Sequence, residues 1–136
     1  MTELIPVQFH KILQTQAYTT IILGTDQKKI AIYTEPLVGK HLQTYLTEEE
    51  NPRPQTHDFI DTLLRGLEVK ILQVVIHHLE DTVYFARIFL EQNLGDRTLI
   101  LEIDARPSDC ITLAIMHNAP VFCKKDLFDE ALGIEA

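Results

Sequence analysis

A nearly continuous apolar helix, predicted over residues 107–117, constrains the fold more than any other feature of this sequence. After Asp109, no charged residue occurs until the next apolar segment has passed. Pro107 suits the first helical position, and Asn118 predicts the end of the helix. Because the helix is apolar on nearly every side, the rest of the chain must enclose it, and residues 121–122 read as a short buried strand that follows it.

Apolar and β-branched residues predict strands at residues 4–13, 18–23, 29–34, 68–79, 83–90 and 98–103. Apolar residues three and four positions apart predict helices that begin at Pro36 and Thr56, and a short terminal helix at residues 125–132. We expect Thr56 to cap its helix. The inward-facing residues of that helix are expected to be Phe59, Ile60, Leu63, Leu64 and Leu67.

These elements predict an α+β fold, with one mixed and mostly antiparallel sheet and helices packed on it. The chain of 136 residues, 46% of them hydrophobic, can bury its own core, so we expect a single domain over residues 1–136. Strand edges of such a domain often associate, and we therefore also expect a homo-oligomer.

Composition limits the classes of function. The net charge of −8 excludes the broad positive field that supplies most non-specific affinity for nucleic acids. Tryptophan is absent and aromatic residues make up only 7%, which argues against a surface of stacking platforms for single strands. Any nucleic-acid substrate must therefore be held locally, by a few arginines or lysines or through a bound cation.

The cysteines and the N-terminal sequence indicate a cellular compartment. Cys110 and Cys123 do not form a metal-binding or redox spacing, which predicts two free, reduced thiols. The sequence shows no basic segment followed by a long apolar run, and no stretch approaches the roughly 20 apolar residues of a membrane span. We expect a cytoplasmic protein without membrane association.

The most concentrated polar cluster precedes and opens the apolar helix, and contains Asp104, Arg106, Ser108 and Asp109. In a functional interpretation, the two aspartates bind a divalent cation or one of them acts as a general base, while Arg106 holds a phosphate. In a structural interpretation, Ser108 and Asp109 cap free helix amides and Arg106 pairs with either aspartate. Residue types alone leave both interpretations open.

A second polar cluster opens the preceding helix at Thr56, His57 and Asp58. Imidazole titrates near neutrality, so His57 is a candidate general acid or base, and Asp58 is close enough to influence its charge. Alternatively, Thr56 and Asp58 only complement the helix N-terminus. Arg53, in the polar loop before this helix, is a candidate phosphate ligand because it is expected to be exposed.

Both clusters carry a resemblance to a known family. Residues 104–109 read Asp-Ala-Arg-Pro-Ser-Asp and precede an apolar helix and an Ala-Pro-hydrophobic run, and residues 53–58 read Arg-Pro-Gln-Thr-His-Asp. In this order, the two motifs resemble the signature of the bifunctional nuclease domain family. The resemblance covers nearly the whole chain and implies nuclease activity on DNA and RNA.

On this resemblance, we expect the two Arg-Pro helix starts to converge into one site that hydrolyses phosphodiester bonds. Arg53, Arg106 and Ser108 are the predicted phosphate-binding residues. The predicted acid, base or metal-binding residues are His57, Asp58, Asp104 and Asp109, with Mg²⁺ or Mn²⁺ held by Asp104 and Asp109. The alternative is a non-catalytic, oligomeric protein-interaction module in which both motifs are architectural.

Overall fold

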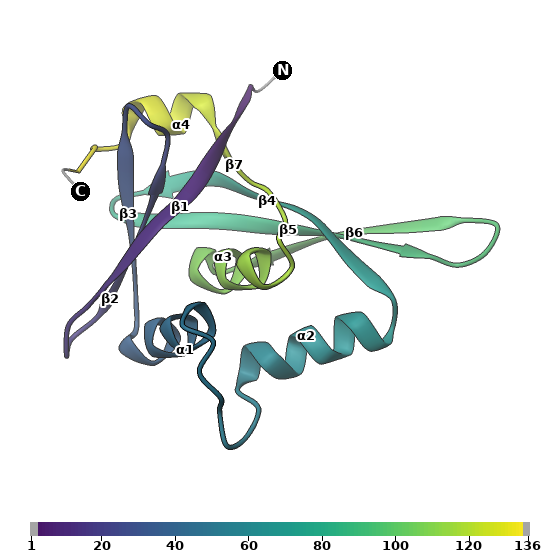
Figure 1. Ribbon diagram of the computed structural model, residues 1–136. Helices are drawn as coiled ribbons and strands as arrows, with labels where there is room; N and C mark the ends of the chain where they lie inside the picture. The colour runs from purple at the N-terminus through teal and green to yellow at the C-terminus, as the bar shows by residue number, and fades with distance from the viewer. Residues whose placement is uncertain (1–2, 135–136) are drawn as a thin grey trace.

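The computed structural model describes residues 3–134, and within them the chain forms one seven-stranded sheet and four helices (Figure 1). All neighbouring strands are antiparallel except the parallel pair β4 and β7. The α+β class and the mixed, mostly antiparallel sheet predicted from the sequence are confirmed. In sheet order, the strands are β3 (Lys29–Thr34), β2 (Thr19–Gly24), β1 (Leu4–Gln14), β7 (Val121–Lys124), β4 (Val69–Glu80), β5 (Val83–Asn93) and β6 (Thr98–Ala105).

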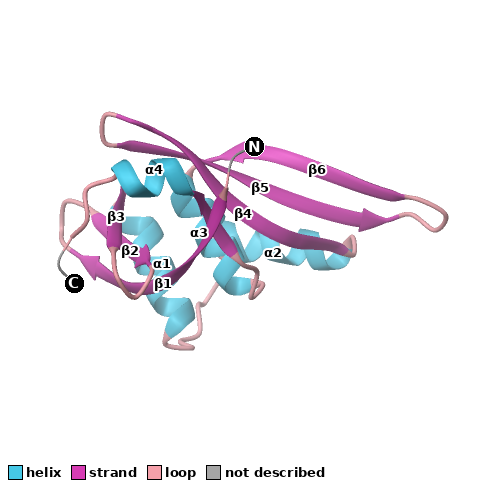
Figure 2. Ribbon diagram, turned by 90° about the horizontal axis from the view of Figure 1, so that it is seen from above, coloured by secondary structure: helices cyan, strands magenta, loops and turns pink. Residues whose placement is uncertain are grey.

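Helix α3 (Pro107–Met116) is the apolar helix predicted over residues 107–117, and the chain encloses it. It contacts β3, β4 and β5, and also the two helices α1 (Pro36–Leu46) and α2 (Thr56–Gly66). Ile111 and Ala114 are each 1% exposed, and Thr112 is fully buried. The sheet therefore curves around α3, with α1 and α2 on its remaining sides (Figures 1 and 2).

Helix α2 differs from its prediction in two respects. Its N-cap residue is Gln55, and Thr56 is the first helical residue, because the Asp58 carboxylate accepts the Gln55 backbone N–H. Its apolar residues also do not all point inward: Phe59 and Leu67 are each 60% exposed and Leu63 is 46% exposed. The reason is that the main contacts of α2, with α3 and β4, do not cover the side of the helix that carries Phe59, Leu63 and Leu67.

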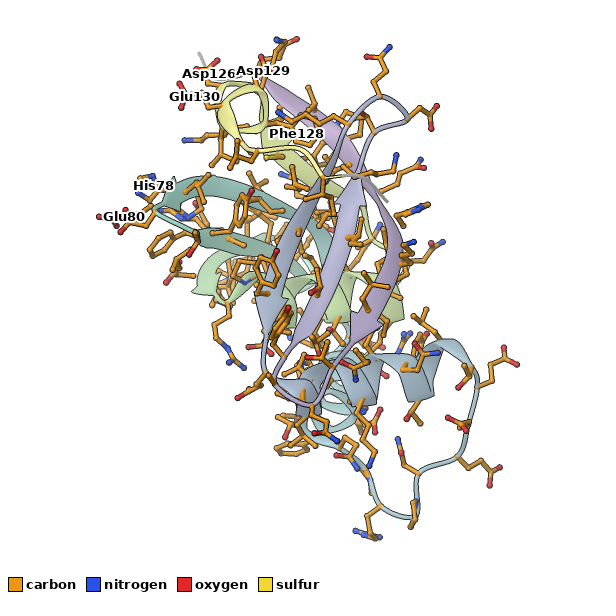
Figure 3. The ribbon with its side chains drawn as sticks, turned by 90° about the vertical axis from the view of Figure 1, so that its left-hand side faces the viewer. His78, Glu80, Asp126, Phe128, Asp129 and Glu130 are labelled. Carbon is orange, nitrogen blue, oxygen red and sulfur yellow. The ribbon has the colours of Figure 1, made fainter. Side chains whose placement is uncertain are left out.

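The terminal helix α4 (Lys125–Glu130) is shorter than the predicted residues 125–132, because the backbone becomes extended at Ala131. Phe128 packs into the core, whereas the acidic side chains of α4 lie on the surface (Figure 3). These acidic residues lie at the opposite end of the molecule from α1 and α2 (Figures 1 and 3). Part of the negative charge is thus placed away from the helices that form the site described below.

Both cysteines are buried free thiols, as predicted. Burial raises the pKa of Cys110 and of Cys123 to about 12, so neither supplies a thiolate nucleophile at neutral pH. Among the described residues, no helix combines the length and the apolar character that crossing a membrane requires.

Candidate active site at three helix N-termini

A groove of about 510 Å³ lies where helices α1, α2 and α3 begin. Glu35, Gln55 and Arg106, the residues immediately before these three helices, all line it. The remainder of the groove is largely apolar and extends between α2 and the β5–β6 hairpin. Its apolar lining includes Ile60, Leu64, Ile88, Leu90, Ile103, Ala105 and Leu113.

Local sequence explains why these helix ends suit a polar site. Pro36 and Pro107 occupy the first positions of α1 and α3, where a missing N–H costs no helical hydrogen bond. The first turns of α1 and α3, which have no side-chain cap, still present free backbone N–H groups, and all three helices present the positive end of the helix dipole. Three such ends at one groove provide a local positive potential in an acidic chain.

The central polar contact joins α2 to α3. His57, which is 7% exposed, donates from Nε2 to Asp109 Oδ1 at 2.9 Å. Arg106 donates to both oxygens of the same carboxylate, from Nε to Oδ2 at 2.9 Å and from Nη2 to Oδ1 at 3.3 Å. Its Nη1 donates to Glu35 Oε1 at 3.1 Å, which connects α1 to the network. One carboxylate therefore orients both an imidazole and a guanidinium.

Electrostatics keep Asp109 and Arg106 ionised. The hydrogen bond from His57 is the largest cause that lowers the pKa of Asp109, and the bonds from Arg106 lower it further, against the opposing effect of burial. The hydrogen bonds to Asp109 and Glu35 raise the pKa of Arg106 above its already high value. At neutral pH, the groove thus contains a fixed carboxylate and a fixed guanidinium side by side.

A second histidine, His41 of α1, stacks on His57, with ring centroids 5.3 Å apart and an interplanar angle of 16°. His41 is only 6% exposed, and neither of its ring nitrogens has a hydrogen-bond partner. Burial is the main cause that lowers its pKa, and this outweighs the opposite effect of Asp58, whose Oδ1 lies 3.7 Å from Nε2. His41 is therefore a neutral imidazole at the side of the groove at neutral pH.

Comparison with known proteins identifies the family of this chain. The model of the bifunctional nuclease domain matches residues 21–135, which is most of the chain. The chain belongs to the bifunctional nuclease domain family. Two uncharacterized proteins of Mycobacterium tuberculosis, from strains H37Rv and CDC 1551, are each 28% identical to it over 82 residues. This match covers 60% of the chain and 46% of each relative, so it spans about half the length of these curated relatives.

The structure of this bifunctional nuclease domain does not bring Asp104 into the groove. Ile103 and Ala105 of β6 line the groove, and side chains alternate along a strand, so Asp104 points to the other face of the sheet. There it is exposed and lies opposite Arg87 of β5. Asp104 and Asp109 are consequently on different sides of β6, which corrects the prediction that they share one site.

Ser108 and Arg53 also lie outside the groove. Ser108 is 3% exposed, and its hydroxyl accepts a hydrogen bond from Thr34 Oγ1 at 3.1 Å, so it joins α3 to β3 inside the core. Arg53 is exposed in the loop between α1 and α2, as predicted, but it is not among the residues that line the groove. Of the predicted phosphate-binding residues, only Arg106 borders the groove.

Asp58 faces a separate hollow of about 370 Å³, which it lines together with His41, Glu48 and Glu49. Its Oδ2 accepts the Gln55 backbone N–H at 2.8 Å, so the carboxylate closes the first turn of its own helix. Asp58 therefore lies beside His41 but does not line the groove itself.

Two residues that the fold places at the site, Glu35 and His41, were not among the site residues predicted from the sequence. The sequence contains a pattern that could have identified Glu35, because Glu35 precedes Pro36 at a helix start as Arg106 precedes Pro107. It contains no such pattern for His41, since its stacking partner His57 is brought close only by the packing of α1 beside α2.

The donor set does not fit the predicted two-aspartate cation site. Both oxygens of Asp109 are occupied by His57 and Arg106, and Asp104 lies on the other face of the sheet. Among residues 3–134, no three histidine, cysteine or acidic side chains are arranged to hold one metal ion. The predicted Mg²⁺ or Mn²⁺ therefore has no pair of aspartate ligands in this arrangement.

Proposed function

We propose that this bifunctional nuclease domain hydrolyses phosphodiester bonds in DNA, RNA or both, at the groove formed by the three helix N-termini. The observation that carries the proposal is the convergence of three helix starts on Arg106, His57 and Asp109. Free amides, a helix dipole and an arginine are the groups that bind phosphate in proteins. An imidazole held by a carboxylate beside them is a means of proton transfer.

Each residue has a distinct role in this proposal. Asp109 holds Nε2 of His57, which leaves Nδ1 to accept a proton from the attacking water or hydroxyl as its oxygen bonds to phosphorus. The imidazolium returns this proton to the leaving oxygen as the other P–O bond breaks. The Asp109 carboxylate stabilises the imidazolium that results, and so acts on the reaction through His57. Arg106 is a phosphate ligand, because its side chain is 58% exposed while its carboxylate partners fix its direction. The helix N-termini neutralise charge that develops on the phosphate oxygens.

The proposal also accounts for activity in an acidic chain. The positive potential at the groove comes from helix ends and one oriented guanidinium, not from a wide basic surface. Binding through so few charges depends only weakly on salt compared with a protein that makes many phosphate contacts. We expect a shallow salt dependence and modest affinity for nucleic acid.

No catalytic step is assigned to a metal ion, because the residues at the groove do not provide the two-aspartate site. The expectation of Mg²⁺ or Mn²⁺ dependence remains a prediction that the assay below includes.

The test is cleavage of single-stranded and duplex DNA and RNA by the purified chain, with EDTA, Mg²⁺ or Mn²⁺. We expect His57→Ala to lower the rate by about 10²–10⁴-fold, the usual contribution of a general acid or base. Asp96→Asn, which removes an exposed turn carboxylate away from the groove, is the matched control. Asp104→Asn is also expected to retain activity, because this residue faces away from the groove.

Two results would overturn the proposal. One is that the folded wild-type chain cleaves none of the four substrates. The other is that His57→Ala and wild type cleave equally. The non-catalytic alternative would then hold, and it has one supporting observation of its own. Asp109 and Arg106 have protein partners that tie α1, α2 and α3 together, and Asp58 closes the first turn of its own helix.

A further inference from the structure

The hollow that Asp58 faces has no part in the proposed reaction. It has a volume of about 370 Å³ and lies between the last turn of α1, the loop that follows it and the first turn of α2. Among its lining residues, only His41 also lines the groove. We call it the acidic hollow and define it by the residues that line it, which are His41, Tyr45, Leu46, Glu48, Glu49, Asn51 and Asp58.

The charge of the acidic hollow is unbalanced. Glu48, Glu49 and Asp58 supply three carboxylates, and no lysine or arginine lines the hollow. Within residues 3–134, neither glutamate forms an ion pair, and the ion-pair contact of Asp58 is with His41. Helix α1 also ends here without a basic residue in its last turn, so the negative end of its dipole is not compensated. Charge at this place therefore favours a cation.

His41 provides a second, independent indication of a ligand. Its side chain is only 5% exposed, and neither ring nitrogen has a hydrogen-bond partner in the described part of the chain. Buried polar atoms in proteins are normally paired, and leaving one unpaired is costly. The wall of the hollow thus contains a buried acceptor that the protein itself does not satisfy.

The geometry at His41 suits one bridging donor. Nε2 of His41 lies 3.7 Å from Asp58 Oδ1, which is too far for a direct hydrogen bond. A single donor nitrogen at about 2.9 Å from both atoms closes the gap with ordinary hydrogen-bond lengths. An ammonium group can do this, because it carries three N–H donors and no acceptor.

The arrangement favours an organic cation over a metal ion. No three histidine, cysteine or acidic side chains in residues 3–134 are arranged to hold one metal ion. Asp58 belongs to α2, whereas Glu48 and Glu49 belong to the loop after α1, so the hollow suits charges that are separated from one another. Its volume also lies in the range of about 300–1,000 Å³ that is usual for small-molecule sites.

The remaining walls suit an alkyl chain between the charges. Tyr45 and Leu46 are each 39% exposed and line the hollow. Methylene groups that connect charged groups pack favourably on such apolar surface while the charges stay on polar partners.

We infer that the acidic hollow binds a linear polyamine, an alkyl chain that carries two or more ammonium groups. One ammonium donates to Asp58 and to the acceptor nitrogen of His41. The next ammonium lies beside Glu48 and Glu49, and the methylene groups between them pack on Tyr45 and Leu46. This inference does not depend on nuclease activity.

A polyamine at this position joins the end of α1 to the start of α2. Asp58 closes the first turn of α2, and His41 of α1 stacks on His57. A ligand that bonds to both Asp58 and His41 therefore also fixes the ring against which His57 packs. Occupancy of the hollow is thus linked to the position of a residue in the groove.

The experiment is isothermal titration calorimetry of the full chain with spermidine and putrescine at low ionic strength, where charges are least screened. We expect one saturable site per chain with a Kd below about 1 mM. Butylamine, which has the carbon chain of putrescine but one ammonium group, should bind about fivefold more weakly because it loses one ion pair.

Variants test the position of the site. Glu48→Gln combined with Glu49→Gln should weaken spermidine binding by about tenfold, because two ion pairs are lost. His41→Phe keeps a ring against His57 but removes the acceptor, and should weaken binding by about tenfold or more. The matched control is Asp126→Asn combined with Glu130→Gln, which changes the net charge equally at exposed positions of α4 and should leave binding unchanged.

Nuclear magnetic resonance of the histidine rings provides a readout inside the hollow. The ring signals of His41 should shift in proportion to spermidine occupancy, because its nitrogen gains a donor. The signals of His78, which is exposed at the other end of the molecule from α1 and α2, should not shift (Figures 1 and 3).

Three outcomes would overturn the inference. The first is that spermidine shows no saturable binding with a Kd below about 1 mM. The second is that the α4 control weakens binding as much as the loop variant, which would mean that the ligand only follows the net charge. The third is that Mg²⁺ binds more tightly than spermidine and displaces it, which would make the hollow a metal site. None of these measurements uses nuclease activity, so failure here and failure of the proposed function are separable.

Discussion

Helices α2 and α3 begin alike and continue differently. Each has an acidic residue at its third helical position, and both begin at the groove. The body of α3 is enclosed on all sides, whereas α2 leaves an apolar stripe uncovered. The first turns of both helices therefore contribute to the candidate site. Beyond the first turn, α3 packs inside the chain, whereas α2 leaves apolar side chains exposed to solvent.

The largest difference in stability is expected between substitutions in α3 and in α2 beyond their first turns. Ile111→Ala in α3 removes a side chain that is 1% exposed and should lower the free energy of unfolding by about 2–5 kcal/mol. Leu63→Ala in α2, measured by urea unfolding of protein dilute enough to be monomeric, should change it by less than about 0.5 kcal/mol. Equal losses would mean that the chain itself covers the α2 stripe.

The next largest difference is expected between substitutions of the two acidic residues at the third helical positions, Asp109 and Asp58. Asp109 reaches across to His57, whereas Asp58 caps its own helix. Asp109→Asn should lower the cleavage rate by about 10²-fold, because His57 loses its charged partner. Asp58→Asn should cost about 1 kcal/mol of stability, the usual effect of a lost helix cap, and retain most of the cleavage rate. Steady-state cleavage and thermal unfolding of both variants test this expectation. A large loss of cleavage rate in Asp58→Asn, with the rate retained in Asp109→Asn, would exchange the roles of the two aspartates.

Acid should loosen α2 before α3. Burial lowers the pKa of His41 and of His117, which lie against His57 and Asp61 of α2 respectively. In the unfolded chain, histidine takes up a proton near pH 6.5, so below this pH the unfolded state binds more protons and stability falls, by up to about 1.4 kcal/mol per pH unit for each histidine.

Hydrogen exchange from pH 7 to pH 5 would show the α2 amides losing protection first, and His41→Phe should flatten the stability profile. The lowered pKa of Asp109 acts in a different window, because its contribution is present above the usual aspartate pKa and is lost only when the pH falls through the lowered value. Loss of protection in α3 ahead of α2 between pH 7 and pH 5 would contradict the expectation that acid loosens α2 first.

The smallest effect is expected at Glu35. Its ion pair with Arg106 is exposed, and such pairs contribute about 0–1 kcal/mol. Glu35→Gln should therefore leave stability nearly unchanged, while it removes a negative charge from a groove proposed to bind phosphate. Titration with a short labelled oligonucleotide should show up to a few-fold tighter binding. Weaker binding would indicate that Glu35 orients Arg106 more than it repels the ligand.

The parts that the sequence predicted depend on local pattern. The α3 helix could be predicted because no charged residue interrupts it after Asp109, and Pro107 marked its start. The strands followed from β-branched runs, and the family from two short motifs. Each of these signals is contained within a few consecutive residues, and tertiary contacts did not override them.

The parts that the sequence did not predict depend on neighbours far along the chain. The spacing of Phe59, Leu63 and Leu67 is that of a packed helix, and spacing alone does not say whether the same chain supplies the partner surface. Asp104 was grouped with Asp109 by proximity in sequence, although the alternation of β6 turns it to the other face. The stacking of His41 on His57 arises only when α1 and α2 pack side by side.

Strand β7 gives the fold an order of assembly. Its four residues separate β1 from β4 and pair with both, so the three strands before α1 and the three between α2 and α3 share no direct ladder. During synthesis, the first 120 residues can form two partial sheets, each with an unsatisfied edge. Only the arrival of Val121–Lys124 joins them, so the slow, non-local closure of the sheet waits for a segment that follows the other six strands along the chain.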